Sequence, residues 1–238
     1  MTEDSKRRWH PSAGLTLFGR KPALEALMDP LLEIHCLHLA NSNRSGGIIT
    51  QIMTEAERRG VETRFHDRQA LSRISKNGRQ DQGVALDVIC PGFQDLDAVL
   101  ASSTLPRSLL ALDGITNPQN VGMIIRSAVA AGIDGVLYPQ RGIASLGPLV
   151  IKASAGTIFR APIIRCDTTL SALSSLKASG FHVAILDAHA TGSLYDLDGG
   201  TPTVCVLGGE SHGISPDVRG LADAALSIPM ANGVESLN

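Results

Sequence analysis

The feature that most constrains the fold of this chain is a regular alternation of short apolar segments with helical patterns over residues 108–238. Five of the apolar segments have the length and composition of strands, namely LLALDG, GVLYP, PIIRC, HVAILDA and TVCVLGG. Strands that alternate with helices are joined by crossovers, so neighbouring strands run parallel and helices cover the sheet. The sequence therefore predicts an α/β domain with a mostly parallel sheet.

A smaller α/β unit is predicted upstream, over residues 15–90. The segment LFGRKPALEALMDP places apolar residues on one helical face, EIHCLHLA is typical of a strand, and IITQIMTEAERRG has helical spacing up to Gly60. The segment VALDVI, just before Pro91, completes the unit as a further strand. Residues 91–107 contain two prolines and a glycine, and we interpret them as a linker with one short helix.

The composition excludes several classes of protein. Of the 238 residues, 43% are hydrophobic and 18% charged, which suffices for packed cores and excludes a disordered chain. The four cysteines are far apart and include no C-x-x-C pair, so a disulfide scaffold is not expected. No apolar run approaches the roughly 20 residues that span a bilayer, and the basic N-terminus lacks the apolar segment of a signal peptide. We therefore expect a soluble, cytoplasmic protein with no membrane partner.

The charge is distributed unevenly along the chain. Residues 1–79 carry a net charge of +4 and residues 80–238 a net charge of −6, and the basic excess is concentrated between Arg58 and Arg79. Such a surface can bind a polyanion, although a solvated helix surface has the same composition. With only 3% aromatic residues, a stacking platform for single-stranded nucleic acid is not supported.

The first candidate site is the segment ITNPQNVGMIIRSAVAAG, which follows the strand LLALDG. Asn117 and Pro118 are typical of a helix N-cap and a first helical residue, which places a sharp turn at the carboxyl end of a strand, where open α/β sheets bind ligands. Gly122 and Arg126 share a helical face, so the glycine leaves room for a ligand or another backbone beside the guanidinium. Asn120, in the first turn, can donate or accept a hydrogen bond. An ordinary capped helix with a surface arginine has the same spacing.

The second candidate site is the segment VCVLGGESHGIS, where a buried strand enters a glycine-rich loop. Glycines after a strand let backbone groups approach a ligand. Residues Gly209 to Gly213 also fit the G-x-S-x-G elbow of hydrolases, with Ser211 as nucleophile. In such hydrolases the nucleophilic serine is followed along the chain by an acidic residue and then by a histidine. No histidine follows His212 in this sequence, which disfavours a hydrolase. Neither half has G-x-G-x-x-G after its first strand, which argues against a Rossmann nucleotide site.

Two further segments carry polar residues. The C-terminal stretch LSIPMANGVESLN is either a polar loop after a strand or a frayed terminus. His35, Cys36 and His38 are close in sequence, but in a strand only Cys36 and His38 share a face, and no second cluster completes a four-ligand set. We therefore expect no metal site.

Taken together, these segments resemble the three motifs of the SpoU/TrmH family of RNA 2′-O-ribose methyltransferases, in the SPOUT class. The matching stretches are NPQNVGMIIRSA, VLGGESHGIS and IPMANGVESLN, with KASAGT between the first two. Their order and spacing cover residues 108–238. The stretches LFGRKPALEAL and DQGVALDVI are similar to the small L30e-like RNA substrate-binding domain that precedes the catalytic domain in the ribosomal-RNA branch of this family.

The resemblance implies a SPOUT α/β-knot domain, a homodimer, and S-adenosylmethionine bound in a deep C-terminal trefoil knot. Carried over onto this sequence, the cofactor-binding positions are Leu207, Gly208, Gly209, Ile228, Met230 and Leu237. The family continues past its last asparagine with a further helix, so the knot would be incomplete in a chain that ended at Asn238.

The resemblance also implies the catalytic group, which consists of Asn120, Arg126, Glu210, Ser236 and Asn238. Because arginine is almost always protonated, Arg126 is better suited to binding the adjacent phosphate than to acting as a base. The other four residues would orient the arginine and the ribose. No metal is needed, since the positive sulfur already activates the methyl group.

The implied substrate is RNA. The domain arrangement favours a guanosine in 23S ribosomal RNA, with transfer RNA as the second choice. An alternative from a different class is a protein that keeps the fold and binds RNA without catalysis. The complete set of Asn120, Arg126, Glu210 and Asn238 favours the enzyme.

Overall fold

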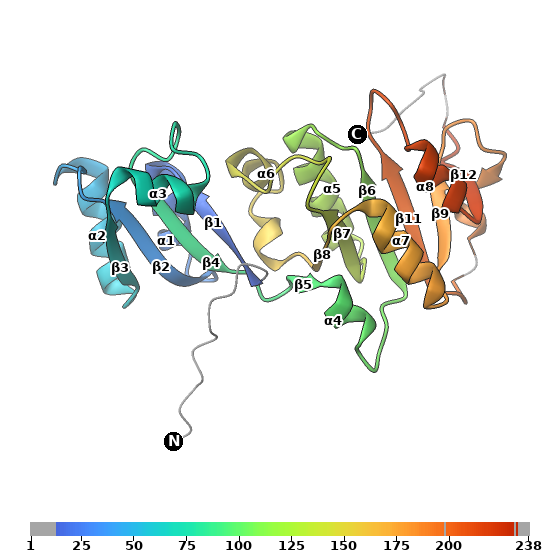
Figure 1. Cartoon of the computed structure of the whole chain (residues 1–238), viewed down its shortest axis with the longest axis horizontal. Coiled ribbons are helices and arrows are strands. Elements are labelled where there is room, and N and C mark those ends of the chain that lie inside the picture. Colours follow the sequence, from blue (N-terminus) through green and yellow to red (C-terminus); the bar gives the residue numbers. More distant parts are fainter. Residues whose placement is uncertain (1–12, 198, 231, 233–238) are drawn as a thin grey trace. The chain divides into compact units, whose positions relative to one another are not determined.

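The computed structural model describes residues 13–197, 199–230 and 232. The chain forms two compact units that divide between Pro91 and Gly92, and each of them is an α/β unit, as predicted (Figure 1). Among the described residues, no helix combines the length and the apolar character needed to cross a lipid bilayer.

The described part of the first unit has a four-stranded sheet and three helices. The strands are β1 (Gly14–Phe18), β2 (Glu33–Ala40), β3 (Glu62–His66) and β4 (Val84–Ile89), and the helices are α1 (Arg20–Met28), α2 (Gly47–Arg58) and α3 (Arg68–Ser75). The strand order is β1-β4-β2-β3, with β4 antiparallel to both neighbours and β3 parallel to β2. Strands β1, β2 and β3 therefore end at one edge of the sheet, and each is followed there by a helix.

Most of the elements predicted for the first unit are confirmed. EIHCLHLA forms β2, VALDVI forms β4, and α2 ends just before Gly60, whose φ of +64° closes the helix. The sequence analysis did not identify β3 and α3. Their segments are mostly polar because β3 is an exposed edge strand and α3 buries only Leu71 and Ser75.

The second unit is built on an eight-stranded sheet in which every neighbouring pair of strands is parallel, so the predicted parallel sheet is confirmed. The sheet order is β10-β12-β9-β11-β6-β7-β8-β5. The strands are β5 (Gln94–Asp95), β6 (Ser108–Asp113), β7 (Gly135–Pro139), β8 (Ile163–Cys166), β9 (His182–Leu186), β10 (Gly192–Ser193), β11 (Thr203–Gly208) and β12 (Ala224–Ser227). The helices are α4 (Leu96–Leu100), α5 (Pro118–Ala130), α6 (Pro148–Ala153), α7 (Thr169–Ala178) and α8 (Pro216–Leu221), with 3-10 turns η2 (Thr157–Arg160) and η3 (Leu194–Asp196).

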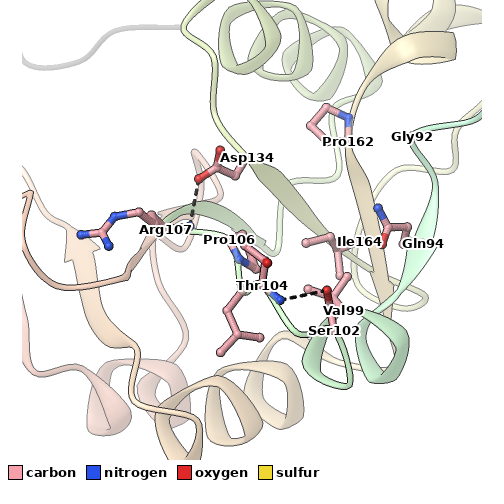
Figure 2. Close-up of a pocket in the computed structure, with 11 residues that line it drawn as sticks. Gly92, Gln94, Val99, Ser102, Thr104, Pro106, Arg107, Asp134, Pro162 and Ile164 are labelled. Carbon is pink, nitrogen blue, oxygen red and sulfur yellow. Dashed lines mark hydrogen bonds between the residues drawn. The ribbon is translucent and has the colours of Figure 1, made fainter.

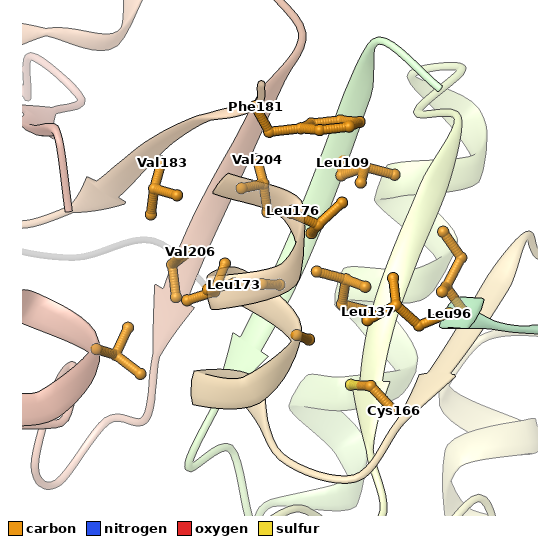
Figure 3. Close-up of a cluster of buried hydrophobic side chains, with 14 of the residues drawn as sticks. Leu96, Leu109, Leu137, Cys166, Leu173, Leu176, Phe181, Val183, Val204 and Val206 are labelled. Carbon is orange, nitrogen blue, oxygen red and sulfur yellow. The ribbon is translucent and has the colours of Figure 1, made fainter. Parts of the chain in front are cut away.

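Helix α7 covers one face of this sheet and forms the centre of its apolar core (Figure 3). Leu173 and Leu176 of α7 lie in one buried cluster with Leu109 of β6 and with Val204 and Val206 of β11. Burial of a side chain of this size contributes about 1.5–3 kcal/mol. The cluster therefore fixes β6 beside β11, and these are the strands whose carboxyl ends carry the first two candidate sites.

The segment 91–107, which we interpreted as a linker, belongs to the second unit from Gly92 onward. Strand β5 extends the sheet beside β8, and α4, the expected short helix, contributes Leu96 and Val99 to the buried cluster. The sequence did not reveal this packing because the segment is short and its partner surface, the edge of the sheet, is formed by residues far along the chain.

The topology contains a switch point between β6 and β11. From β6 the chain continues to β7 and β8 on one side, whereas β11 lies on the other side of β6. The helices that follow the two strands also pack apart, since α5 contacts α6 and α8 contacts α7. Parallel α/β sheets bind their ligands at the carboxyl edge beside such a switch point.

Candidate active site

The first motif forms the turn from β6 into α5. Gly114 has a φ of +68°, and the side chain of Asn117 accepts a hydrogen bond from the backbone N–H of Gln119 at 2.9 Å. Pro118 is the first helical residue. The predicted N-cap and helix start are therefore confirmed, and they lie at the carboxyl edge of the sheet.

Gly122 allows α5 to approach α6 closely. A Cβ atom at this position would lie 2.7 Å from the carbonyl oxygen of Val150 and 2.9 Å from the backbone nitrogen of Ser154. Of the two occupants that the sequence left open for this space, a ligand or another backbone, the structure shows a backbone.

Arg126 lies one turn further along α5, is exposed, and makes no hydrogen bond or ion pair to any residue that the structure describes.

The second motif forms a closed loop at the end of β11. The backbone groups of Gly209 and Gly213 pair in both directions, at 3.1 and 2.8 Å. A Cβ atom on Gly208 would lie 2.6 Å from the backbone nitrogen of Ile214, and one on Gly209 would collide with the carbonyl oxygen of Gly114. The sequence analysis attributed these glycines to the approach of a ligand, but the space beside them is taken by the chain's own backbone.

Two contacts join the first two motifs. The side-chain amide of Asn120 donates a hydrogen bond to the carboxylate of Glu210, and the carboxylate of Asp113 accepts one from the backbone N–H of Ser215 at 2.8 Å. The structure thus brings together two of the predicted catalytic residues, Asn120 and Glu210. Asp113 was not among the sequence candidates, although its place at the end of a strand before a sharp turn is a usable signal.

The side chains of Ser211 and His212 are exposed and have no hydrogen-bond partner among the described residues. They lie within the loop closed by Gly209 and Gly213, and α8 begins only at Pro216. A nucleophile elbow places its serine on a direct strand-to-helix turn. The geometry therefore gives no support to a hydrolase.

The sheet opens beside β11 at its carboxyl edge. The pairing of β11 with β9 ends at Val206, whereas its pairing with β6 continues to Gly208. On its other edge, strand β9 pairs with β12 up to Leu186. The backbone of Leu207 and Gly208 consequently lies outside the β9 ladder, where its polar groups can bind a ligand.

The third motif follows β12 on the far side of β9. Ile228 and Met230 are both half-buried, whereas Ser236, Leu237 and Asn238 lie outside the described residues, and so does the segment on which the predicted knot depends. The sheet order places β9 between β11 and β12, so the loop after β9 lies between the second and third motifs.

The loop after β9 was not identified as a candidate from the sequence. The carboxylate of Asp187 accepts a hydrogen bond from the backbone N–H of His189 at 3.0 Å and pairs with Arg219 of α8 at 2.7 Å, and both interactions hold the pKa of this carboxyl below its usual range. The carboxylate thereby ties the loop to α8. Its strand, HVAILDA, was recognised, but only the sheet order shows that it separates two motifs.

Comparison with known proteins identifies the family. The model of the SpoU rRNA Methylase family matches residues 107–238, and a model described as RNA 2′-O ribose methyltransferase substrate binding matches residues 16–90. The chain belongs to the SpoU rRNA Methylase family. The resemblance inferred from the motifs is confirmed, and the protein is an RNA methyltransferase of this family.

Relatives and solved structures agree with this assignment. A protein of Mycolicibacterium vanbaalenii, named an uncharacterized tRNA/rRNA methyltransferase, is 37% identical over 225 residues, which cover 93% of this chain and 71% of that protein. The SpoU methyltransferase AviRb from Streptomyces viridochromogenes, crystallised with AdoMet, has a TM-score of 0.60 at 23% identity and covers 95% of this chain and 85% of its own. An AdoMet-bound rRNA methyltransferase from Sinorhizobium meliloti has a TM-score of 0.58 at 22% identity, with 95% and 82% coverage. At these identities the two structures show the fold.

The SpoU-family unit also has a cleft at the opposite, amino edge of its sheet (Figure 2). This cleft has a volume of about 460 Å³ and is lined by residues from β5, α4, the segment before β6, and the starts of β7 and β8. At its rim, Asp134 accepts hydrogen bonds from the backbone N–H groups of Arg107 and Ser108, both at 2.9 Å. None of the family's motif residues lines this cleft.

His38, one of the residues that the sequence offered for a metal site, is part of a packed polar chain in the first unit. His38 contacts Asp87 through Nε2 and His66 through Nδ1, both at 3.0 Å, and Thr16 donates to Asp87 at 2.6 Å. Burial by itself would lower the pKa of His38, but the hydrogen bonds to Asp87 and Cys36 raise it to about 9. Among the described residues, no three potential metal ligands converge.

The basic stretch of the first unit divides into engaged and free side chains. The guanidinium of Arg59 donates to the carbonyl oxygens of Leu27 and Asp29 at 3.0 and 2.9 Å, and also to that of Leu32, which fixes the end of α1. Two other cations of the stretch are paired, Arg58 with Glu55 and Arg64 with Glu62. The basic stretch from Arg58 to Arg79 is therefore not a uniform surface for binding a polyanion.

A cleft of about 510 Å³ lies at the edge of the first unit where β1, β2 and β3 end. It is lined by Arg20, Ala40, Ser42, Asn43, Arg68, Gln82 and Gly83. Arg20 is held there by hydrogen bonds to the side chain of Asn43 and the carbonyl oxygen of Gln82, both at 3.2 Å. Arg68 is exposed and makes no hydrogen bond or ion pair within the described part of the chain.

Proposed function

We propose that this SpoU-family protein is a homodimeric enzyme that transfers the methyl group of S-adenosylmethionine to a ribose 2′-hydroxyl of RNA, with a guanosine of 23S ribosomal RNA as its target. The proposal rests on one observation above all, the hydrogen bond between Asn120 and Glu210 at the switch point of the sheet. The exposed Arg126 stands on the helix that begins at the same place. Family membership supports the same reaction.

The carboxyl edge fits the cofactor through its backbone. Leu207 and Gly208 lie outside the β9 ladder, and Ile228 and Met230 follow β12, so these positions, with Gly209 and Leu237, are the ones proposed to hold S-adenosylmethionine. When bound, the cofactor supplies a methyl group on a positively charged sulfur. The glycines contribute by closing the loop on itself, since their Cβ positions are filled by backbone.

The chain's own residues prepare the nucleophile. A ribose hydroxyl is a poor nucleophile near neutral pH and needs a proton acceptor or electrostatic help, together with accurate placement. Arg126 is free to bind the phosphate beside the target ribose with two parallel hydrogen bonds, so that this phosphate or a partner group accepts the hydroxyl proton. Asn120, oriented by Glu210, acts with Ser236 and Asn238 to place the ribose.

The first unit is proposed to hold the RNA backbone at the cleft that contains Arg20 and Arg68. Further cations, Arg44, Lys76 and Arg79, belong to segments at the same edge. Helices α1, α2 and α3 begin at this edge, and α3 is capped by the carboxylate of Asp67, whereas α1 and α2 have no acidic residue at the N-cap or in the first turn. The positive ends of the α1 and α2 dipoles therefore reinforce the basic side chains, and the combination favours phosphate groups.

A methyl-transfer assay tests the function directly. The protein is incubated with labelled S-adenosylmethionine and with 23S ribosomal RNA or transfer RNA, and the product nucleoside is identified. We expect 2′-O-methylguanosine in ribosomal RNA, and loss of the same mark from RNA of a strain that lacks the gene. Label in transfer RNA alone would assign the alternative target. Binding of RNA and cofactor without transfer would identify an inactive RNA-binding homologue.

A further inference from the structure

We propose that Asp113 is a positioning residue for methyl transfer, which holds the loop of residues 209–215 against the β6–α5 turn so that Glu210 meets Asn120. The inference rests on the proposed function, because it assigns Asp113 a role within that site. The residue touches neither of the two catalytic side chains in any described contact, and it acts through the backbone of the loop that carries one of them.

The position of Asp113 suits this role. It is the last residue of β6 and lies opposite Gly208, the last residue of β11, in the register of the two strands. Its Oδ2 atom accepts the hydrogen bond from the backbone N–H of Ser215 at 2.8 Å in a half-buried setting. A carboxylate forms shorter and stronger hydrogen bonds to N–H groups than a neutral acceptor does. Asp113 thus connects the strand end before the loop of Asn120 to the far end of the loop of Glu210.

The other anchors of the loop leave its orientation open. The backbone pairing of Gly209 with Gly213 joins the two ends of the loop, and the buried side chain of Ile214 anchors the loop in the apolar core. Apolar packing is not directional, and the side chain of Ser215 makes no capping hydrogen bond to α8. Among the described contacts, the hydrogen bond to Asp113 is the directional tie between the base of this loop and β6.

Loss of this tie should affect catalysis more than binding. Glu210 is exposed, and Asn120 is its hydrogen-bond partner among the described residues, so rotation of the loop separates the pair. A misplacement of about 1 Å in a catalytic group can cost on the order of 100-fold in rate. We therefore expect Asp113→Ala to lower kcat about 10- to 100-fold and to leave KM for RNA nearly unchanged, because the first unit holds the RNA.

The chain offers matched variants on both sides of the hydrogen bond. Ser215→Pro removes the N–H that Asp113 accepts, and the φ of −60° at this position suits a proline ring. Ser215→Ala keeps the N–H and serves as its control. Asp134→Ala removes a carboxylate that also accepts backbone N–H groups, but at the amino edge of the same sheet (Figure 2). Asp113→Asn keeps an acceptor oxygen in place of the carboxylate.

The experiment measures kcat, KM for RNA, cofactor affinity by calorimetry, the midpoint of thermal unfolding, and hydrogen–deuterium exchange of residues 209–215 in the full-length protein. We expect Asp113→Ala and Ser215→Pro to speed exchange in this loop and lower kcat alike. Their double variant should be no worse than the poorer single variant. Asp113→Asn should retain more activity than Asp113→Ala, and Ser215→Ala and Asp134→Ala should keep wild-type kcat and loop exchange.

Two results would overturn the inference. One is wild-type kcat and loop exchange in Asp113→Ala, and the other is an Asp134→Ala variant that loses as much kcat at the same thermal midpoint. If Asp113→Ala does not fold, the same comparison between Ser215→Pro and Ser215→Ala decides the question. Failure of the wild-type protein to methylate any RNA would contradict the proposed function instead, while the exchange data would still show whether Asp113 holds the loop.

Discussion

The side-chain amide of Asn120 donates a hydrogen bond to the carboxylate of Glu210, 90 residues further along the chain. The two residues lie in the segments that follow β6 and β11, strands that are neighbours in the sheet although four other strands, β7 to β10, separate them in sequence. Each motif by itself could be an ordinary capped helix or a glycine-rich turn. Their contact at the switch point brings the two motifs into one candidate site.

Replacement of Arg126 by alanine should abolish methyl transfer and leave the affinity for S-adenosylmethionine nearly unchanged. The guanidinium is exposed on α5 and no described residue engages it, whereas the cofactor is proposed to bind to the backbone of Leu207 and Gly208. Arg126→Lys should fail as well, because one ammonium group cannot form the paired hydrogen bonds of a guanidinium. Single-turnover assays and calorimetry on the same preparations measure the two effects.

The control for Arg126 is Arg107→Ala, which removes an exposed arginine at the amino edge of the same sheet, where it contacts the carbonyl oxygens of Gly199 and Gly200. This variant should keep its methyl-transfer rate. If Arg126→Ala lost affinity for S-adenosylmethionine to the same extent as activity, this would contradict the proposal that Arg126 binds the RNA phosphate.

Replacement of Gly208 by alanine should destabilise the second unit even in the absence of cofactor. The new Cβ atom would meet the backbone of Gly213 and Ile214, and such overpacking costs about 1–3 kcal/mol. The control is Gly220→Ala in α8, where a Cβ atom meets nothing within 4 Å and alanine should stabilise the helix by up to about 1 kcal/mol. Denaturant unfolding of the cofactor-free protein measures both. Unchanged stability in Gly208→Ala would restore the view that this glycine exists only for ligand approach.

The motif glycines Gly122 and Gly208 differ from the helix-cap residues in how much the sequence reveals about their role. Asn117 and Pro118 act on residues next to them, so their effect was predicted correctly. The partner of Gly122 is α6, and its identity depends on tertiary packing. The sequence therefore predicted that something lies close to these glycines, but it could not distinguish a ligand from the chain's own backbone.

Arg59 and the segment before β6 illustrate the same limit. Composition placed Arg59 in a basic surface, but the end of α1 happens to present carbonyl oxygens to its guanidinium, and only the fold reveals that. Residues 91–107 have the prolines of a linker, Pro91 and Pro106, yet Leu96 and Val99 are buried in the core of the second unit. The motifs, in contrast, were identifiable because each is contiguous in sequence.

The stability of the first unit should fall as the pH rises from about 6.5 to about 9. The pKa of His38 is raised to about 9 in the folded protein against an ordinary value of 6.5, so its protonated form stabilises the fold below 6.5 and this contribution is lost as the pH passes 9. The contribution is at most about 3 kcal/mol. Hydrogen exchange of the amides of β2 and β4, corrected for the intrinsic rate, measures it for this unit alone.

The control for this pH dependence is His38→Gln, which should be less stable at pH 7 and should show a flatter profile between pH 7 and 9. The comparison starts at pH 7 because of His66, whose pKa is lowered by burial and by the charge of His38. Deprotonation of His66 at lower pH therefore raises the stability of the unit with rising pH, which is the opposite of the effect of His38. A profile in His38→Gln as steep as that of the wild-type protein would contradict the assignment to His38.

RNA affinity should depend on the cleft of the first unit rather than on its whole basic stretch. Arg68 lines the cleft and has no described partner, whereas Arg58 is already paired with Glu55 at 2.8 Å. Arg68→Gln should therefore weaken RNA binding and lower the slope of log Kobs against log salt by about 0.7–0.9, the value for one lost phosphate contact. Filter binding at several salt concentrations measures both quantities.

Arg58→Gln is the matched control for Arg68→Gln, because it removes the same charge from the same unit and should change neither affinity nor slope. Arg59 is unsuitable for this test, since its guanidinium holds the carbonyl oxygens of Leu27 and Asp29 and its loss would destabilise the unit itself. Equal effects of Arg58→Gln and Arg68→Gln would indicate that RNA senses only the net charge of the unit. No effect of either would mean that the cleft is an ordinary solvated surface and that RNA is held elsewhere.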